Sequence, residues 1–196
     1  TEMEKILVID DQAINVDYYR KFLASAGYSV ITAINGETGV DLFEKERPDL
    51  VLLDIIMPGM DGFEAARLMR CDPALQHIPI IFITGALCDT GSKVKALDSH
   101  VNDYIIKPID DAEVLSKIRA LLRMKHLYDE LEMTRDQIHK NEKRYRRIIE
   151  SMEEGYVETD LAGNFLFFNN SLARILRVSP DKLPGINKEE FITIRT

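Results

Sequence analysis

The sequence predicts an α/β fold whose first part is a five-stranded, parallel, doubly wound sheet of the flavodoxin-like type. Between residues 5 and 107, five short apolar runs alternate with segments whose apolar residues recur at helical spacing. Runs of this kind fit strands that are buried on both faces, as in a parallel sheet. Because crossovers between parallel strands are right-handed, few topologies remain, and we expect the strand order 2-1-3-4-5.

Glycine, proline and asparagine mark the ends of the expected elements. Gly27 follows the first helical pattern, and the pair Asn35-Gly36 turns the chain after the second strand. The expected strands are residues 5–10, 28–33, 49–53, 78–84 and 103–107. The expected helices are residues 12–26, 40–47, 62–70 and 91–99.

A helical pattern that contains neither Pro nor Gly runs from Ile109 to Glu154. Apolar residues recur every seven positions within it, at Met124, Leu131, Ile138, Tyr145 and Met152. The positions three residues further on are half apolar and half polar: Leu127, Thr134, Asn141 and Ile148. A heptad period held over about four repeats predicts a two-stranded coiled coil, and its polar seam positions make it a weak one. A solvated charged helix and two shorter helices are the alternatives.

The last part of the sequence predicts a small α+β segment. Gly155 ends the long helix, and residues 155–170 alternate like a β-hairpin with its turn at Ala162-Gly163-Asn164. Ser171 is expected to cap a short helix that stops at Pro180. Two strands and a helix form a marginal core, so we expect an incomplete domain. The predicted division is therefore a first domain of residues 1–123, a coiled-coil helix of residues 124–152, and an incomplete domain of residues 153–196.

The composition favours a globular protein of the cytoplasm. Hydrophobic residues make up 45% and charged residues 30% of the chain, and no apolar run approaches the ~18 residues of a membrane span. The net charge of −8, without a long Lys/Arg run before the long helix, argues against a nucleic-acid surface. Cys71 and Cys88 are isolated in the sequence, which indicates reduced thiols rather than a disulfide.

Polar side chains close four of the five expected strands. Asp10 and Asp11 end the first strand, Asp54 the third, Thr84 the fourth and Lys107 the fifth. Each has an ordinary role when it occurs alone, as a helix cap, a turn residue or a solvated lysine. Because ligands collect at the carboxyl ends of parallel strands, the five together indicate one functional site.

The types of these residues predict phosphoryl chemistry with Mg²⁺. Three ionised carboxylates repel one another and need a cation, and Mg²⁺ accepts carboxylate, phosphate and water oxygens. An ionised aspartate such as Asp54 can attack phosphorus and form an aspartyl phosphate. Lys107 and the Thr84 hydroxyl can then contact the oxygens of the transferred group.

Residues 4–123 resemble the receiver domain of two-component response regulators. The matching pieces are Asp10-Asp11, Asp54-x-x-Met57-Pro58-x-Met60-Asp61-Gly62, Thr84-Gly85-Ala86 and Lys107-Pro108. The resemblance implies that Asp54 accepts a phosphoryl group from a phosphohistidine of a sensor histidine kinase or a phosphotransfer protein. It implies a regulatory module rather than an enzyme, with any output enzyme outside this chain.

The resemblance also implies a role for each site residue. The implied Mg²⁺ site comprises Asp11, Asp54 and the backbone carbonyl of Ile56, with Asp10 acting through water. Thr84 and Lys107 are implied to contact the phosphoryl group. Tyr104 is implied to be an aromatic switch that turns inward as Thr84 moves, and the peptide bond before Pro108 is implied to be cis.

Residues from about 145 to 196 are similar to the first half of a PAS sensor domain. The matching pieces are Arg144-Tyr145-Arg146-x-Ile148-Ile149-Glu150, Thr159-Asp160-x-x-Gly163-x-Phe165 and Asn169-x-Ser171. The helix before this segment resembles the signalling helices that join such modules. His126 and His139 lack the Ser/Asn-His-Glu-Leu-Arg setting of a kinase acceptor, so we interpret them as solvated helix residues.

Two hypotheses and two alternatives complete these expectations. Phosphorylation is expected to alter the pairing of a homodimeric coiled coil, which passes the state to the PAS segment and the output. The apolar residues Ile56 and Ala86 flank the site and cannot orient an attacking water, which predicts slow autodephosphorylation.

One alternative is a receiver-shaped dimerisation scaffold that is not phosphorylated. The other is a phosphohydrolase of the haloacid-dehalogenase type, for which the segment Asp10-Asp11-Gln12 lacks the required Asp-x-Asp pattern.

Overall fold

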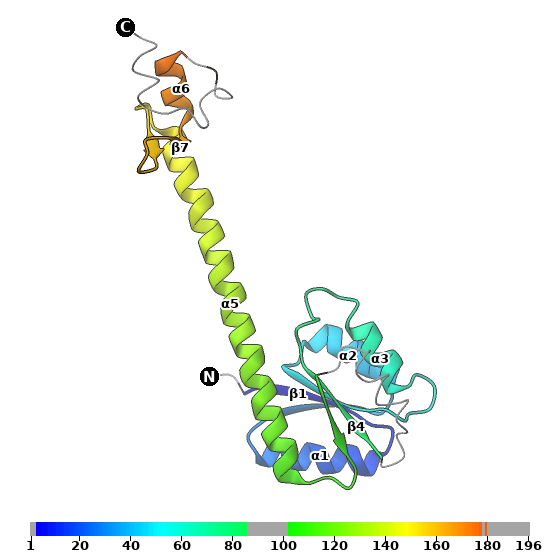
Figure 1. The fold of residues 1–196 in the computed structure, drawn as a ribbon. Coiled ribbons are helices and arrows are strands. Elements are labelled where there is room, and N and C mark those ends of the chain that lie inside the picture. Colours follow the sequence, from blue (N-terminus) through cyan, green and yellow to red (C-terminus); the bar gives the residue numbers. More distant parts are fainter. Residues whose placement is uncertain (1–2, 86–101, 178, 180–196) are drawn as a thin grey trace. The chain divides into compact units, whose positions relative to one another are not determined.

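The computed structural model describes residues 3–85, 102–177 and 179 and divides into two compact units, Thr1–Leu131 and Glu132–Thr196. The first unit has the predicted α/β fold (Figure 1). Its sheet comprises β1 (Lys5–Ile9), β2 (Ser29–Ala33), β3 (Leu50–Asp54), β4 (Ile80–Thr84) and β5 (Asp103–Ile106). All neighbouring strands are parallel, and the order β2-β1-β3-β4-β5 confirms the predicted topology.

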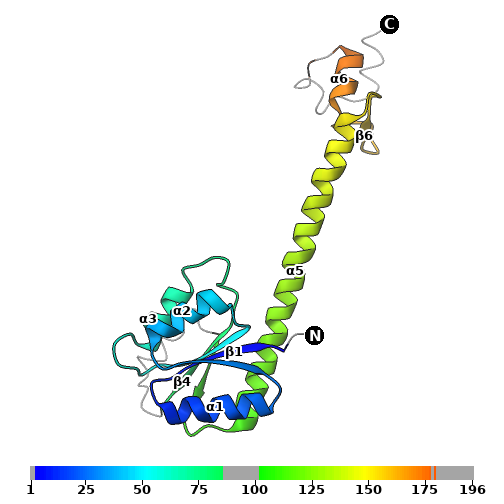
Figure 2. The same ribbon diagram turned by 180° about the vertical axis from the view of Figure 1, so that it is seen from behind.

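Helices cover both faces of the sheet, as seen from two sides in Figures 1 and 2. The helices of this unit are α1 (Ala13–Ser25), α2 (Gly36–Glu46), α3 (Gly62–Met69) and the first part of α5 (Asp111–Ser151). Apolar side chains of α2 and α3 share one core with one face of the sheet, and those of α1 and α5 share a second core with the other face. The helix expected at 91–99 lies outside the described residues.

Alternation along the strands explains why they read as unbroken apolar runs in the sequence. Leu53 of β3 and Phe82 of β4 belong to the core under α2 and α3. Leu52 and Ile83, next to them in the sequence, belong to the core under α1 and α5. Since successive side chains of a strand point to opposite faces, both faces need apolar residues.

The face that α1 buries agrees with only part of the spacing that predicts the helix. Of the four apolar residues at helical spacing, Ile14 and Tyr18 are exposed, Phe22 is half-buried against the core and Leu23 is buried, together with Val16 and Tyr19. Because two overlapping stripes of apolar residues exist in this helix, the spacing identifies a helix without identifying its buried side.

The start of α3 brings the chain back against the end of β3. Asp61 caps the helix by accepting a hydrogen bond from the Glu64 amide, 2.8 Å away. A Cβ atom at Gly62 would lie 2.3 Å from the backbone oxygen of Asp54. Glycine is therefore required here, and the loop between β3 and α3 is held close to Asp54.

Helix α5 lies against the sheet through Val114, Ile118, Leu121 and Leu122, which are all buried. It follows the cis peptide bond Lys107-Pro108, which confirms that prediction. The uninterrupted helix to Ser151 also confirms the long helical segment.

Polar contacts continue the buried stripe of α5 by two more turns. The Lys125 side chain is only 11% exposed, and its ammonium lies 3.1 Å from Asp49 Oδ1 and 2.6 Å from Asp129 Oδ2. The ring of Tyr128 stacks on His77 with centroids 5.0 Å apart. We call Asp49, His77, Lys125, Tyr128 and Asp129 the α5 clamp. Because Asp49 directly precedes β3, the α5 clamp lies at the amino edge of the sheet. Asp54 ends the same strand at the opposite, carboxyl edge.

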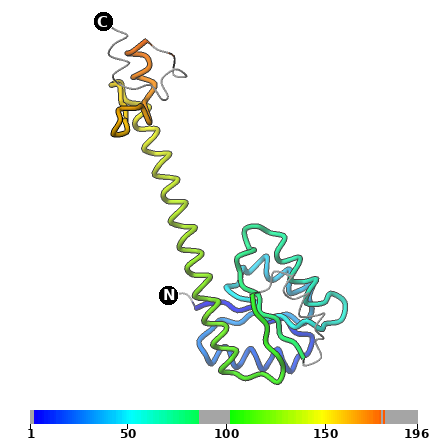
Figure 3. Tube along the Cα trace, viewed as in Figure 1, coloured from blue at the N-terminus to red at the C-terminus, as the bar shows by residue number. Residues whose placement is uncertain are grey.

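The second unit confirms the predicted hairpin and short helix, whose trace is visible in Figure 3. β6 (Val157–Thr159) pairs antiparallel with β7 (Phe165–Phe168), and α6 spans Asn170–Leu176. The expected cap was wrong, because Asn169 rather than Ser171 caps α6, by accepting from the Leu172 amide. The Ser171 hydroxyl instead donates to the carbonyl of Met152.

Asn169 also ties α6 to the end of α5. Its side-chain amide donates to the carbonyls of Ile149, at 3.0 Å, and Glu154, at 2.8 Å. Its Oδ1 accepts from the Tyr156 amide as well as from that of Leu172. The residue is fully buried, and all four of these hydrogen bonds are made within the second unit.

Candidate functional site

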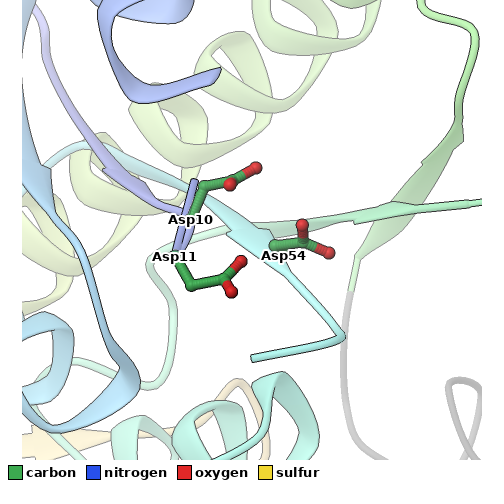
Figure 4. A group of neighbouring side chains, drawn as sticks. All are labelled: Asp10, Asp11 and Asp54. Atoms are coloured by element: carbon green, nitrogen blue, oxygen red, sulfur yellow. The ribbon is translucent and has the colours of Figure 1, made fainter. Parts of the chain in front are cut away.

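The acidic residues predicted to form a site lie together at the carboxyl edge of the sheet (Figure 4). Asp10 and Asp11 directly follow β1, and Asp54 is the last residue of β3. One carboxylate oxygen from each lies within 4.8 Å of the others. The strand register explains this, because Ile9 lies opposite Leu53, so that Asp10 and Asp54 reach the same level.

Thr84 and Lys107 reach the same edge through the next two strands. Asp54 lies opposite Ile83 of β4, and Thr84 lies opposite Ile106 of β5. The Lys107 amide donates to the Thr84 carbonyl at 2.7 Å. The Thr84 side chain is buried, and its hydroxyl donates to the carbonyl of Gly85.

Lys107 supplies positive charge to this acidic cluster. Its Nζ donates to Asp54 Oδ2 at 2.8 Å and lies 3.4 Å from Asp10 Oδ2. Burial lowers the pKa of Lys107, but the hydrogen bond and the charge of Asp54, with a contribution from Asp10, outweigh burial and raise this pKa. Lys107 therefore stays protonated, and among the described residues its single positive charge faces the three carboxylates.

Asp10 is the most enclosed of the three acids, with no exposed surface. Its burial raises the pKa of the carboxyl group, and the charge of Asp54 acts in the same direction. The Gln12 amide, the Asn15 side chain and Lys107 oppose this by stabilising the ionised form. The Gln12 amide donates to Asp10 Oδ1 at 2.9 Å.

The donor set fits a small, hard cation such as Mg²⁺. Among the described residues, Asp11 Oδ1 is buried and has no hydrogen-bond partner. An unpaired carboxylate oxygen beside two more carboxylates is costly unless a cation binds. Because all the groups are oxygens and few in number, water and phosphate oxygens can complete the six ligands that Mg²⁺ prefers.

Of the two remaining predicted site residues, Ile56 contacts the acidic cluster and Tyr104 lies at the surface of β5. The Ile56 amide donates to Asp54 Oδ1 at 3.3 Å, while its side chain is 67% exposed. Tyr104 lies inside β5 and is 44% exposed, with the Lys117 ammonium 5.8 Å from its ring centroid. The structure thus brings Ile56 to Asp54 and leaves Tyr104 on the outer surface of the sheet edge.

Sequence reasoning missed Asn15. Its side-chain amide donates to both oxygens of Asp10, at 3.0 Å each. The signal was present, because α1 begins three residues after Asp10 and an asparagine at the third position of this helix lies within reach of that carboxylate. Cys71 is a free, exposed thiol, as expected, and Cys88 and Ala86 lie outside the described residues.

The parallel sheet, with an acidic cluster, a threonine and a lysine at its carboxyl edge, is the arrangement that the receiver resemblance implies. The chain belongs to the response regulator receiver family, whose model matches residues 6–119. The PAS domain model matches residues 143–195. Both matches agree with the resemblances found in the sequence, and α5 connects the matched segments along the chain.

Curated relatives match somewhat less than two thirds of the chain. The chain is 41% identical to the response regulator PleD of Caulobacter vibrioides over 127 residues, which is 65% of this chain and 28% of PleD. It is 39% identical over 121 residues to the DNA-binding dual master transcriptional regulator RpaA of Synechocystis, covering 62% of this chain and 50% of RpaA. The chain therefore spans half or less of the length of these two relatives.

Solved receiver structures share the fold. The receiver domain of a histidine kinase from Syntrophus aciditrophicus has a TM-score of 0.58 and 32% identity, covering 61% of this chain and 90% of that one. A CheY-like receiver from Methanospirillum hungatei has a TM-score of 0.60 and 27% identity, covering 65% and 99%. In the described part of the chain, no helix is long and apolar enough to cross a membrane.

Proposed function

We propose that the chain accepts a phosphoryl group on Asp54 from the phosphohistidine of a sensor histidine kinase or phosphotransfer protein. The observation that carries this proposal is the cluster of three carboxylates within 4.8 Å, with Lys107 directly on Asp54. Asp54 is 4% exposed, so bulk water has little access to its carboxylate. A nucleophile held beside a lysine and a cation site suits phosphoryl transfer.

The proposed reaction uses the residues in separate roles. An oxygen of Asp54 forms the O–P bond as the N–P bond of the donor breaks, and that electron pair returns to the imidazole nitrogen. Lys107 Nζ and the Thr84 hydroxyl contact the phosphoryl oxygens, where negative charge is concentrated. Asp11, Asp54 and the carbonyl of Ile56 would hold Mg²⁺ directly, with Asp10 acting through water. When bound, Mg²⁺ would neutralise charge between the carboxylates and the incoming group.

The phosphorylated state would be passed to α5 through β5. Lys107 directly follows β5, and Lys117 of α5 bonds Asp103 of that strand at 2.7 Å. If Thr84 moves to the phosphoryl group, Tyr104 on the neighbouring strand can turn inward into the space it leaves. Such a change biases α5 only through contacts that differ between the two states.

The proposed output is a change in a homodimer formed by α5. Six large apolar side chains with at least half of their surface exposed lie at heptad positions: Met124, Leu127, Leu131, Ile138, Tyr145 and Ile148. A helix that is mostly charged and this long gains stability by pairing such a stripe. A second copy of this chain offers the same stripe, so we assign the stripe to a two-stranded coiled coil.

Intact mass after incubation with acetyl phosphate and Mg²⁺ tests the proposal. A gain of about 80 Da, the mass of one phosphoryl group, is expected in the chain and not in Asp54→Asn. Asp41→Asn, on the exposed side of α2, is the matched control and keeps the gain. Light scattering on the same samples reports the oligomeric state.

Two results would point elsewhere. A dimer that gains no mass with acetyl phosphate, nor with a purified phosphohistidine donor, would support the unphosphorylated scaffold. A monomer that gains mass would retain the phosphoacceptor site and remove the coiled coil from the proposal.

A further inference from the structure

The side chain of Asn15 spans the buried carboxylate of Asp10. Its Nδ2 lies 3.0 Å from Asp10 Oδ1 and 3.0 Å from Oδ2, so one amide group bridges both oxygens. Asn15 occupies the first turn of α1, whose start is fixed by the amides of Asn15 and Val16 donating to the Gln12 carbonyl. The bridge therefore joins a rigid helix to a carboxylate on the adjoining strand end.

Few other groups hold Asp10 in place. Among the described residues, the remaining donors are the Gln12 amide, at 2.9 Å from Oδ1, and Lys107 Nζ, at the long distance of 3.4 Å from Oδ2. A single backbone donor on one oxygen leaves the carboxylate free to rotate about its Cβ–Cγ bond. Bonds to both oxygens from Asn15 remove that freedom.

We infer that Asn15 is a positioning residue that orients Asp10 toward the Mg²⁺ site and keeps Lys107 directed at Asp54. This inference rests on the proposed function of the site and adds a residue that the site residues of the receiver resemblance do not include. Residues that orient metal ligands commonly change metal affinity about 10–100-fold when they are replaced.

The unequal contacts of Lys107 support the second half of this inference. Its ammonium is 2.8 Å from Asp54 and 3.4 Å from Asp10, although Asp10 is the more deeply buried acid. A buried carboxylate that lost the two Asn15 bonds would turn to the nearest remaining cation. Lys107 would then be drawn toward Asp10 and away from the oxygen that receives the phosphoryl group.

Calorimetric titration of the full chain with MgCl₂ tests the orientation of Asp10. Asn15→Leu has nearly the same size and no donor, and we expect it to weaken Mg²⁺ binding about tenfold. Asn15→Ser keeps a shorter donor and is expected to recover part of the affinity. Asn170→Leu, the same substitution at an exposed asparagine that donates to the Glu150 carboxylate in the second unit, serves as the matched control with unchanged affinity.

Phosphorylation kinetics at saturating Mg²⁺ test the direction of Lys107. We expect the maximal rate with acetyl phosphate to fall severalfold in Asn15→Leu, since the lost group acts on the reacting centre and not on donor binding. A residue that merely stabilised α1 would lower the melting temperature and leave both the Mg²⁺ affinity and the maximal rate of the folded protein unchanged.

Unchanged Mg²⁺ affinity in a folded Asn15→Leu or Asn15→Ala variant would overturn the inference. Should Asn15→Leu fail to fold, the smaller Asn15→Ala variant answers the same question. Absence of Mg²⁺ binding and of phosphorylation in the unchanged chain would instead refute the proposed function, so the two failures are distinguishable.

Discussion

Mg²⁺ is expected to reverse the stability order of the chain and its Asp11→Asn variant. In the absence of Mg²⁺, Asp11 is the acid of the cluster whose buried oxygen has no hydrogen-bond partner among the described residues. Asparagine has the same shape and no charge. The variant therefore removes repulsion from a cluster in which Lys107 bonds Asp54 and Asp10.

The size of the repulsion follows from the geometry. Two carboxylates with oxygens no more than 4.8 Å apart repel by at least about 3 kcal/mol at an effective dielectric constant near 20. Lys107 and solvent at the partly exposed Asp11 offset much of this energy. We therefore expect Asp11→Asn to raise the free energy of unfolding by about 1 kcal/mol in EDTA, equivalent to about 3–5 °C in the melting temperature.

Mg²⁺ changes this balance by binding only to the folded site. At a concentration ten times its dissociation constant, it stabilises the unchanged chain by about 1.4 kcal/mol. The variant lacks a ligand and gains little. Thermal unfolding followed by circular dichroism, in EDTA and in MgCl₂, should thus show the variant melting higher in EDTA and lower in MgCl₂. Equal gains for both proteins, or no gain for the unchanged chain, would refute the assignment of Asp11 as a ligand.

Four further predictions concern single side chains. The phosphorylated chain should lose its phosphoryl group over minutes or longer, and the Ile56→Glu variant should lose it faster. A half-life of seconds in the unchanged chain would contradict the hypothesis of slow autodephosphorylation. Burial raises the pKa of Asp10, so ionisation of this carboxyl group lowers the free energy of unfolding as the pH rises above about 4. In urea unfolding with EDTA, Asp10→Asn should therefore be more stable than the unchanged chain at pH 7, and it should lose this advantage below pH ~4. In the α5 clamp, Lys125→Met should lower the free energy of unfolding by about 1–2 kcal/mol, because it removes two ion pairs of a nearly buried side chain. Lys140→Met, on the exposed part of the helix, should leave the free energy of unfolding unchanged. Asn169→Ala leaves two carbonyls and two amides without their partner and should lower the stability of the second unit by about 2–4 kcal/mol. The loss should appear as faster hydrogen exchange of the amides that Asn169 bonds, and unchanged exchange would contradict this role.

The sheet and the acidic cluster could be predicted because their signals are local. Buried parallel strands need apolar residues on both faces, so each strand stands out as a run. Once the strands are aligned, the residue that ends each one has a known edge, and Asp10, Asp54, Thr84 and Lys107 meet there. No contact between distant side chains had to be guessed.

The contacts that could not be predicted join residues whose meeting depends on side-chain direction. Asn15 and Asp10 are close in the sequence, but their bond depends on how α1 leaves β1. The pairing of Lys125 with Asp49 depends on the angle at which α5 passes the sheet. Asn169 was part of a recognised motif, yet its bonds to the end of α5 require the folded hairpin.

The buried face of α1 illustrates a different limit. Ile14, Tyr18, Phe22 and Leu23 have helical spacing, and so do Val16, Tyr19 and Leu23. Packing on the sheet decides between them, because Val16, Tyr19 and Leu23 are buried and Phe22 is half-buried, whereas Ile14 and Tyr18 are exposed. Periodicity therefore predicted the helix correctly and could not give its rotation.

The most direct test of the central claim is to locate the phosphoryl group. The chain is incubated with acetyl phosphate and Mg²⁺, reduced with borohydride, which converts an aspartyl phosphate to homoserine, and mapped by peptide mass spectrometry. We predict homoserine at position 54 and at no other aspartate, and none when Mg²⁺ is replaced by EDTA. Homoserine at position 10 or 11, or none in a sample whose intact mass has risen, would contradict Asp54 as the phosphoacceptor.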